Sequence, residues 1–242
     1  MDLNPAPALC YLEFVRISEI FYSIQGEGRL IGVPSVFIRT AGCNLRCVWC
    51  DTPYTSWQPQ GTTWSLSNIL YEVQKHPTEY VIITGGEPLL AAEIEALSQE
   101  LKLSGRHITI ETAGTIFKPI RCDLISLSPK LANSTPWRRQ GGKFALPHER
   151  QRLNLPVIQK FLDKYDYQLK FVVAEKKDFD EITEILKQLK AVDRSQVLIM
   201  AEGTTTARLH ARGRWIADLC KQYGYRFTPR LHIELYGNRR AT

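Results

Sequence analysis

Apolar runs rich in β-branched residues recur at short intervals along the chain, and between them apolar residues follow helical spacing. The runs predict at least six strands: Ser35–Arg39, Tyr80–Thr84, His107–Glu111, Asp123–Leu127, Leu169–Val173 and Val197–Met200. Near-continuous hydrophobicity of this kind is typical of strands buried on both faces, as in a parallel sheet. The helical faces span Leu66–Val73, Leu90–Leu101, Val157–Leu162, Phe179–Leu189 and Trp215–Tyr223. Ser65 directly precedes the first of them and is predicted to be its N-cap. This alternation predicts an α/β fold built from βα units.

Two places break the alternation. Only a short turn fits between Glu111 and Asp123, because Gly114 and Pro119 crowd that interval. The connection from Ser128 to Gln168 is long and carries four prolines, and connections of this length usually have a function or cover a site. No internal repeat or linker interrupts the pattern, so we expect a single domain over residues 1–242.

Composition limits the classes of protein that remain. The 242 residues are 44% hydrophobic and 23% charged, which suits a globular chain with its own core and excludes a disordered chain or a disulfide scaffold. No apolar run reaches the roughly 18 residues that a membrane helix needs. The first ten residues lack the features of a signal peptide. We therefore expect a cytoplasmic protein with reduced thiols and no membrane partner.

Charge is distributed unevenly along the chain. The net charge of +6 divides into −3 for residues 1–121 and +9 for residues 122–242. A basic half can attract nucleic acid or anionic small molecules. The densest basic run, from Arg138 to Arg152, is interrupted by two glycines, a proline and a glutamate. We therefore predict no nucleic-acid partner, and a basic half that helps to hold small anions.

Three of the six cysteines lie within eight residues, as Cys43-x3-Cys47-x2-Cys50. The other three, Cys10, Cys122 and Cys220, are expected to be incidental or structural thiols. Three thiolates from one loop can converge on one metal centre. Zinc favours four protein ligands, or three and a water. A [4Fe–4S] cluster held by three cysteines leaves one iron open to a substrate or cofactor. The ligand count favours the cluster and leaves zinc as an alternative.

Two motifs in this region resemble the radical S-adenosylmethionine (SAM) superfamily. The loop Cys43–Cys50 resembles its CxxxCxxC loop, and it follows a predicted strand as in that superfamily. The next strand ends in Thr84-Gly85-Gly86-Glu87-Pro88, which resembles the GGEP motif that binds the SAM amino group. The resemblance implies that SAM binds the open iron and, after one-electron reduction, releases a 5′-deoxyadenosyl radical. Glu87 is expected to accept hydrogen bonds from the SAM ammonium group.

Five segments narrow the resemblance within the superfamily. They are Phe21–Gly28, Cys50–Thr52, Glu111–Thr115, Ser128–Lys130 and Arg230–His232. Together they closely resemble the 7-carboxy-7-deazaguanine synthases over nearly the whole chain. The resemblance implies an incomplete, trimmed TIM-like barrel of about six parallel strands. It also implies a lyase of queuosine and 7-deazapurine biosynthesis, which contracts 6-carboxy-5,6,7,8-tetrahydropterin to 7-carboxy-7-deazaguanine with loss of ammonia. SAM is regenerated in that reaction.

The resemblance assigns roles to individual residues. Cys43, Cys47 and Cys50 hold the [4Fe–4S] cluster, and Thr52 binds Mg²⁺. The SAM contacts are Trp49, Cys50, Asp51, Gly86, Glu87, Ser128, Pro129, Lys130, Gln168, Leu169, Lys170 and Phe171. The substrate contacts are Ile24, Gln25, Gly26, Glu27, Arg39, Thr84 and His232, with Glu111 a further candidate. No side chain is assigned as a catalytic acid or base, because SAM supplies the radical. The family further implies a homodimer and an external one-electron donor such as flavodoxin or ferredoxin.

Two rival functions stay open from the sequence. A radical SAM activase that installs a glycyl radical on a partner protein is also small and carries CxxxCxxC early, but has no need of the Ile24–Glu27 segment or of Thr52. A zinc-stabilised nucleic-acid-binding module would fit the basic half, but the chain lacks a second Cys-x2-Cys pair.

Overall fold

The described part of the chain is built around a nine-stranded sheet. The computed structural model describes residues 14–242, so Cys10 lies outside the described part. The strand order is β3-β1-β2-β4-β5-β6-β7-β8-β9. The strands are β1 (Phe14–Ile24), β2 (Pro34–Thr40), β3 (Thr62–Ser65), β4 (Tyr80–Gly85), β5 (His107–Thr112), β6 (Leu124–Leu127), β7 (Tyr167–Val173), β8 (Val197–Ala201) and β9 (Arg226–Thr228). All six strands predicted from the sequence are present.

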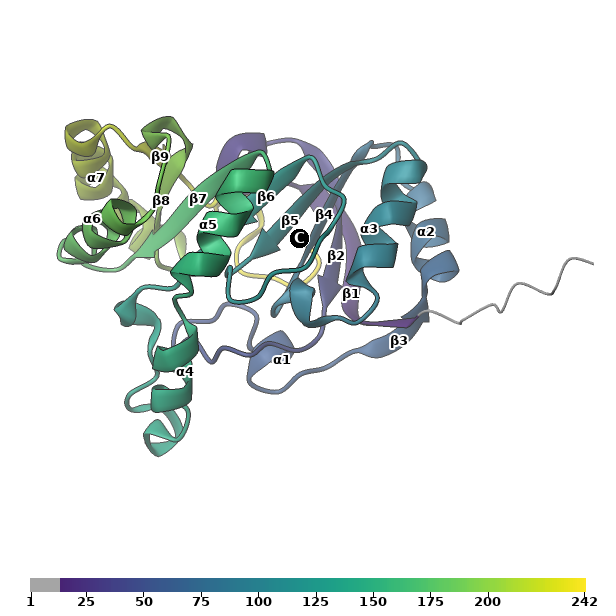
Figure 1. The fold of residues 1–242 in the computed structure, drawn as a ribbon, viewed down its shortest axis with the longest axis horizontal. Coiled ribbons are helices and arrows are strands. Elements are labelled where there is room, and N and C mark those ends of the chain that lie inside the picture. The colour runs from purple at the N-terminus through teal and green to yellow at the C-terminus, as the bar shows by residue number, and fades with distance from the viewer. Residues whose placement is uncertain (1–13) are drawn as a thin grey trace, which may run out of the picture.

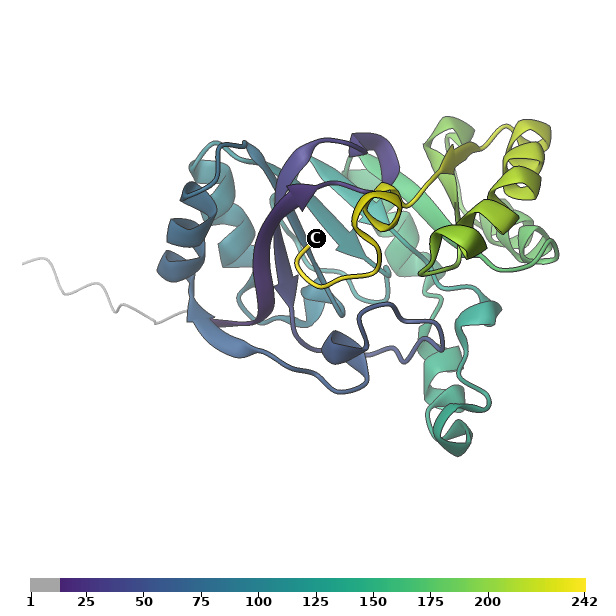
Figure 2. The same cartoon turned by 180° about the vertical axis from the view of Figure 1, so that it is seen from behind.

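Seven of the strands, β2 and β4 to β9, pair in parallel. The sheet is open: β3 and β9 form its two edges, and no pairing joins them within the described residues. The expected trimmed barrel is thus a curved, mostly parallel sheet rather than a closed cylinder (Figures 1 and 2). Residues 14–24, for which the sequence predicted no strand, form the long strand β1, antiparallel to both β2 and β3. Alternation of apolar and polar residues in β1 weakens the apolar-run signal on which the other strands were recognised.

Helices follow most of the parallel strands, as the apolar spacing predicted. They are α1 (Pro53–Ser56), α2 (Leu66–Gln74), α3 (Ile94–Leu103), α4 (Ala145–Gln151), α5 (Leu155–Lys164), α6 (Asp178–Gln188), α7 (Thr206–Tyr223) and α8 (Leu231–Tyr236). Ser65 caps α2 as predicted, since its hydroxyl accepts a hydrogen bond from the Asn68 amide. The predicted face from Leu90 to Leu101 begins too early: Leu90 ends a separate 3₁₀ turn started by Pro88, and α3 starts at Ile94. As predicted, no helix separates β5 from β6.

The two faces of the sheet have different roles. Alternate strand residues such as Val36, Ile38, Val81 and Ile83 are fully buried in the core beneath the helices. The intervening residues, which are more polar, point to the other face, where the chain after α8 also lies (Figure 2). Because side chains alternate along a strand, one face of the sheet is free to carry a functional site.

Candidate active site

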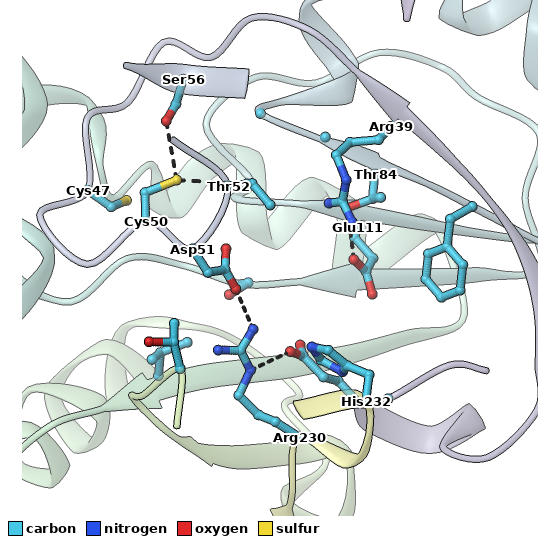
Figure 3. A pocket seen from close by; sticks show the side chains of 18 of the residues that line it. Arg39, Cys47, Cys50, Asp51, Thr52, Ser56, Thr84, Glu111, Arg230 and His232 are labelled. Carbon is cyan, nitrogen blue, oxygen red and sulfur yellow. Dashed lines mark hydrogen bonds and ion pairs between the residues drawn. The ribbon is translucent and has the colours of Figure 1, made fainter. Parts of the chain in front are cut away.

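A cavity of about 590 Å³ lies on that second face, toward the carboxyl ends of the parallel strands (Figure 3). Strands β1 to β8, apart from β3, contribute lining residues, as do the loop after β2 and the C-terminal segment. Carboxyl ends of parallel strands are the usual location of active sites in α/β proteins, because the connecting loops converge there. The predicted site residues that line the cavity are Ile24, Gln25, Gly26, Glu27, Arg39, Cys43, Cys47, Trp49, Cys50, Asp51, Thr52, Thr84, Gly86, Ser128, Lys130, Lys170 and His232.

The three clustered cysteines all lie in the loop after β2 and face the cavity as free thiols. Cys47 is 8% exposed, while Cys43 and Cys50 are half-buried. Burial raises the pKa of Cys43 and Cys47 to about 12 each, so iron must displace protons to bind them. Within residues 14–242, no three His, Cys, Asp or Glu side chains converge closely enough for a single metal ion. A [4Fe–4S] cluster takes one thiolate on each of three irons, and three separate thiols beside an open cavity fit such a group.

The long connection between β6 and β7, in which residues 133–154 had no predicted role, holds this loop in place. The Arg46 amide donates to His148 Nδ1 at 3.0 Å, and the Val48 amide donates to the Ser134 carbonyl at 2.8 Å. His148 is 1% exposed, and its Nε2 lies 2.9 Å from Ser134 Oγ. The Arg139 guanidinium reaches the Val48 carbonyl. The long connection between β6 and β7 thus supports the cysteine loop. The sequence carried no pattern that links it to residues about one hundred positions earlier.

The Gly85-Gly86-Glu87 turn packs directly under the cysteine loop. A Cβ on Gly86 would lie 2.1 Å from the Gly42 carbonyl oxygen, so only glycine fits there. The Glu87 carboxylate, predicted to contact SAM, turns into the protein instead. It accepts hydrogen bonds from Thr112 Oγ1 at 2.7 Å and from the Ala113 amide at 2.9 Å. Burial raises the pKa of Glu87, which is 1% exposed. The Glu87 side chain therefore links the end of β4 to the end of β5. Of Gly86 and Glu87, only Gly86 lines the cavity.

The other predicted SAM contacts divide according to strand alternation. Gln168 and Lys170 point to the cavity side of β7, whereas Leu169 and Phe171 are fully buried in the core below. Contact of Leu169 and Phe171 with SAM therefore stays a prediction, and the side chains of these two residues do not line the cavity. The Gln168 amide donates a hydrogen bond to Ser126 Oγ at 2.7 Å and accepts one from the Arg29 backbone amide. Lys170 is therefore the residue of the Gln168–Phe171 stretch that lines the cavity.

The remaining SAM segment lies at the end of β6. Ser128 and Lys130 line the cavity, but Pro129 between them does not. Lys130 Nζ donates to Ser128 Oγ at 2.8 Å and stands 5.8 Å from the centre of the Trp49 ring. An ammonium over an aromatic face at this distance is stabilised by the ring quadrupole. The arrangement gives the cysteine end of the cavity a fixed positive group.

The predicted substrate contacts form a polar cluster away from the cysteines. Glu111 accepts hydrogen bonds from Gln25 Nε2 at 3.1 Å and from Thr84 Oγ1 at 2.9 Å, so it belongs to this cluster as proposed from the sequence. His232 packs against Gly26: a Cβ there would lie 1.9 Å from Nδ1. The Leu231 amide also donates to the Gly26 carbonyl at 2.9 Å. The C-terminal Arg-Leu-His motif and the early Gln-Gly-Glu motif are therefore one structural unit.

A buried ion-pair network joins the two ends of the cavity. Arg230 donates to Glu27 Oε1 at 2.9 Å and to the Gly203 carbonyl at 2.7 Å, and also pairs with Asp51. Glu27 pairs with Lys170 through its second oxygen. These cations outweigh the cost of burial and hold the pKa of Glu27 well below its ordinary value, and Arg230 does the same for Asp51. Both carboxylates are ionised. Although the Arg230–His232 motif had been recognised, Arg230 was not predicted as a site residue, because charge alone does not reveal a partner 203 positions away.

Thr52 occupies the N-cap position of α1, the ordinary structural role for a threonine, but its side chain makes no capping bond there. Its hydroxyl lines the cavity 3.8 Å from Cys50 Sγ and accepts from Thr55 Oγ1 at 3.3 Å. A hydroxyl oxygen not used for capping is available to a hard cation such as Mg²⁺.

Comparison with known proteins agrees with this geometry. Residues 37–133 match the family model of the radical SAM superfamily. In fold, the chain resembles the crystal structure of QueE from Escherichia coli, with a TM-score of 0.69 and 23% identity over 92% of this chain and 97% of that one. The fold and the cysteine loop define the protein as a radical SAM enzyme, a class that uses a [4Fe–4S] cluster and SAM.

Two curated relatives specify the family. A 7-carboxy-7-deazaguanine synthase of Halobacterium salinarum is 44% identical over 92% of this chain and 90% of its own length. Another, from Rhodopirellula baltica, is 43% identical over 99% of this chain and 93% of its own. The chain belongs to the 7-carboxy-7-deazaguanine synthase family. This membership decides against the glycyl-radical activase and the zinc-stabilised module that the sequence left open.

Proposed function

We propose that this chain contracts 6-carboxy-5,6,7,8-tetrahydropterin to 7-carboxy-7-deazaguanine with loss of ammonia, in the biosynthesis of queuosine and other 7-deazapurines. One observation carries the proposal: a single cavity brings Cys43, Cys47 and Cys50 together with a polar cluster formed by Gln25, Thr84 and Glu111. A radical generated at the cysteine end therefore has a polar substrate pocket beside it.

The cluster and SAM, when bound, would supply the radical chemistry, namely a 5′-deoxyadenosyl radical able to exchange a hydrogen atom with C6 of the pterin. The residues of the chain would bind and orient the cluster, SAM and the pterin substrate. Cys43, Cys47 and Cys50 would hold the cluster, and Trp49, Asp51, Gly86, Ser128, Lys130 and Lys170 would surround SAM. Gln25 and Glu111 offer an amide and a carboxylate to the polar edge of the pterin. The buried network of Glu27, Lys170 and Arg230 needs no rearrangement during the reaction, because each charge already has its partner.

Thr52 would bind Mg²⁺, and the cation would hold the substrate carboxylate through oxygen ligands. The support for this assignment is the Thr52 hydroxyl, which lines the cavity and caps no helix. We further propose a homodimer in the cytoplasm, one domain over residues 1–242, and reduction by an external donor such as flavodoxin or ferredoxin. Within residues 14–242, no helix has both the length and the hydrophobicity to cross a membrane.

Anaerobic turnover tests the proposal. Cluster-loaded protein is incubated with SAM, dithionite and 6-carboxytetrahydropterin, with and without Mg²⁺, and the products are separated by chromatography. We expect 7-carboxy-7-deazaguanine and ammonia in equal amounts, with SAM recovered intact. A protein that cleaves SAM but forms no deazaguanine would refute the assigned substrate. A colourless protein that holds one zinc and no iron would refute the whole class.

A further inference from the structure

Glu19 lies beside the cavity without lining it. It is on β1, with its side chain 11% exposed. Glu19 Oε1 accepts a hydrogen bond from Arg39 Nε at 2.6 Å and another from the Tyr54 hydroxyl at 2.8 Å. Its other oxygen, Oε2, lies 3.6 Å from Nε of Arg240. Arg39, Tyr54 and Arg240 all line the cavity, so Glu19 is the shared partner of three cavity residues.

A β-bulge places Glu19 in this position. The pairing of β1 with β2 shifts by one residue between Ile17, which faces Thr40, and Glu19, which faces Arg39. Ile17 is buried in the core beneath the helices, and without the shift Glu19 would point to that same face. A bulge moves the following side chains to the opposite face, and bulges commonly re-aim a side chain next to an active site. The backbone therefore brings a carboxylate across from Arg39 on the cavity side.

Two contacts hold the Arg39 guanidinium. Its Nε donates a hydrogen bond to Glu19, and its central carbon lies 5.5 Å from the centre of the Phe21 ring. Phe21 is itself fixed by stacking on Phe37, with ring centres 4.9 Å apart and an angle of 6° between the planes. Within residues 14–242, the two terminal nitrogens of Arg39 have no hydrogen-bond partner. A guanidinium held through Nε keeps these two donors as a planar fork, which matches a pair of acceptor atoms.

We propose that Glu19 is a positioning residue that fixes Arg39 with both terminal nitrogens directed at two acceptor atoms of the substrate. The inference rests on the proposed function, which provides a substrate with two such edges: its carboxylate and its pterin ring. Glu19 does not touch the substrate. It acts by removing the freedom of the Arg39 side chain, so that less entropy is lost when the fork binds.

Kinetics of the cluster-loaded enzyme test this role. With dithionite as reductant, we expect E19A to raise KM for 6-carboxytetrahydropterin about tenfold, with a much smaller change in kcat. E19Q keeps an acceptor oxygen of the same size and should lie between E19A and the wild type. Glu184→Ala removes an exposed ion pair with Lys187 on α6 and is the matched control for loss of a glutamate. Iron content and SAM cleavage without pterin should equal those of the wild type in all three variants.

A double-mutant cycle separates positioning from a structural effect. If Glu19 acts through Arg39, E19A should cost nothing further in an R39A background, whereas independent effects would add. R240A removes the partner of Oε2, along with the contacts of Arg240 to the Tyr54 ring and to Gln60, but it leaves the hydrogen bond between Glu19 and Arg39 in place. A rise in KM with R240A equal to that with E19A would place the effect in the C-terminal segment and overturn the inference.

The remaining outcomes are also distinct. Tetrahydropterin without the 6-carboxylate, used as a competitive inhibitor, identifies the edge that Arg39 binds. If E19A weakens this inhibitor as much as the substrate, the fork binds the ring; an unchanged inhibition constant assigns it to the carboxylate. An unchanged KM in E19A, while the wild type forms product, overturns the inference alone. Absence of product with the wild type overturns the proposed function, and the inference with it.

Discussion

Acidification should destabilise the protein through one buried histidine, His148, whose neutral form is built into a chain of hydrogen bonds. The Arg46 amide donates to Nδ1, so the neutral ring carries its proton on Nε2 and donates it to Ser134 Oγ. The Ser134 hydroxyl in turn donates to the Leu131 carbonyl at 2.6 Å. A second proton can enter only at Nδ1, where it would break the bond to the cysteine loop.

The size of the effect follows from the pKa. Burial lowers the pKa of His148 from 6.5 to about 4. In the unfolded chain the residue becomes protonated as pH falls below about 6.5, whereas in the folded protein it stays neutral until about pH 4. Over this interval the unfolded state binds more protons, so stability falls as pH falls. Between pH 7.5 and pH 5, this difference removes about 2 kcal/mol from the free energy of unfolding.

Urea unfolding of the apoprotein at these two pH values measures the loss. His148→Gln cannot titrate, so its unfolding free energy should fall by about 2 kcal/mol less than that of the wild type over the same interval. His210→Gln, which removes an exposed histidine on α7, is the control and should keep the pH dependence of the wild type. Equal losses in the wild type and His148→Gln would refute the hydrogen-bond chain as we describe it.

Three further predictions concern the ion-pair network and the proposed cluster and magnesium sites. Arg230→Met should lower the free energy of unfolding by about 3–5 kcal/mol in urea, because it leaves buried carboxylates without their partner. Arg29→Met, which removes a partly exposed pair, should cost about 1 kcal/mol or less, so equal losses would contradict the reasoning. Cys43→Ser should abolish iron and sulfide incorporation on anaerobic reconstitution, whereas Cys122→Ser should load like the wild type; full loading of the first variant would exclude Cys43 as a ligand. Thr52→Ala should reduce the stimulation of turnover by Mg²⁺ about tenfold or more, whereas Thr52→Ser should stay close to the wild type. An unaltered dependence of turnover on Mg²⁺ concentration in the alanine variant would exclude Thr52 as a Mg²⁺ ligand.

The sequence alone determined the features that are local along the chain. The cysteine loop from Cys43 to Cys50 and the turn at Gly86 are contiguous motifs, and short spacing is enough to define them. The six apolar strands and the Ser65 cap were predictable for the same reason, because hydrophobic runs and capping depend on neighbours a few residues away. These features, together with the family resemblance that the motifs carry, were sufficient for the class of enzyme and for about half of the residues that line its cavity.

Tertiary structure decided which side chains face the site and which partners they have. Leu169 and Phe171 belong to a stretch that the family resemblance assigns to SAM, yet alternation along β7 buries both in the core. Glu87 belongs to the GGEP motif, yet its carboxylate is used by the end of β5. A one-residue shift in pairing reverses the face of a side chain, and such a shift brings Glu19 to Arg39. Strand register and contacts between distant segments follow from the packing of the whole sheet, and no short segment of sequence encodes them.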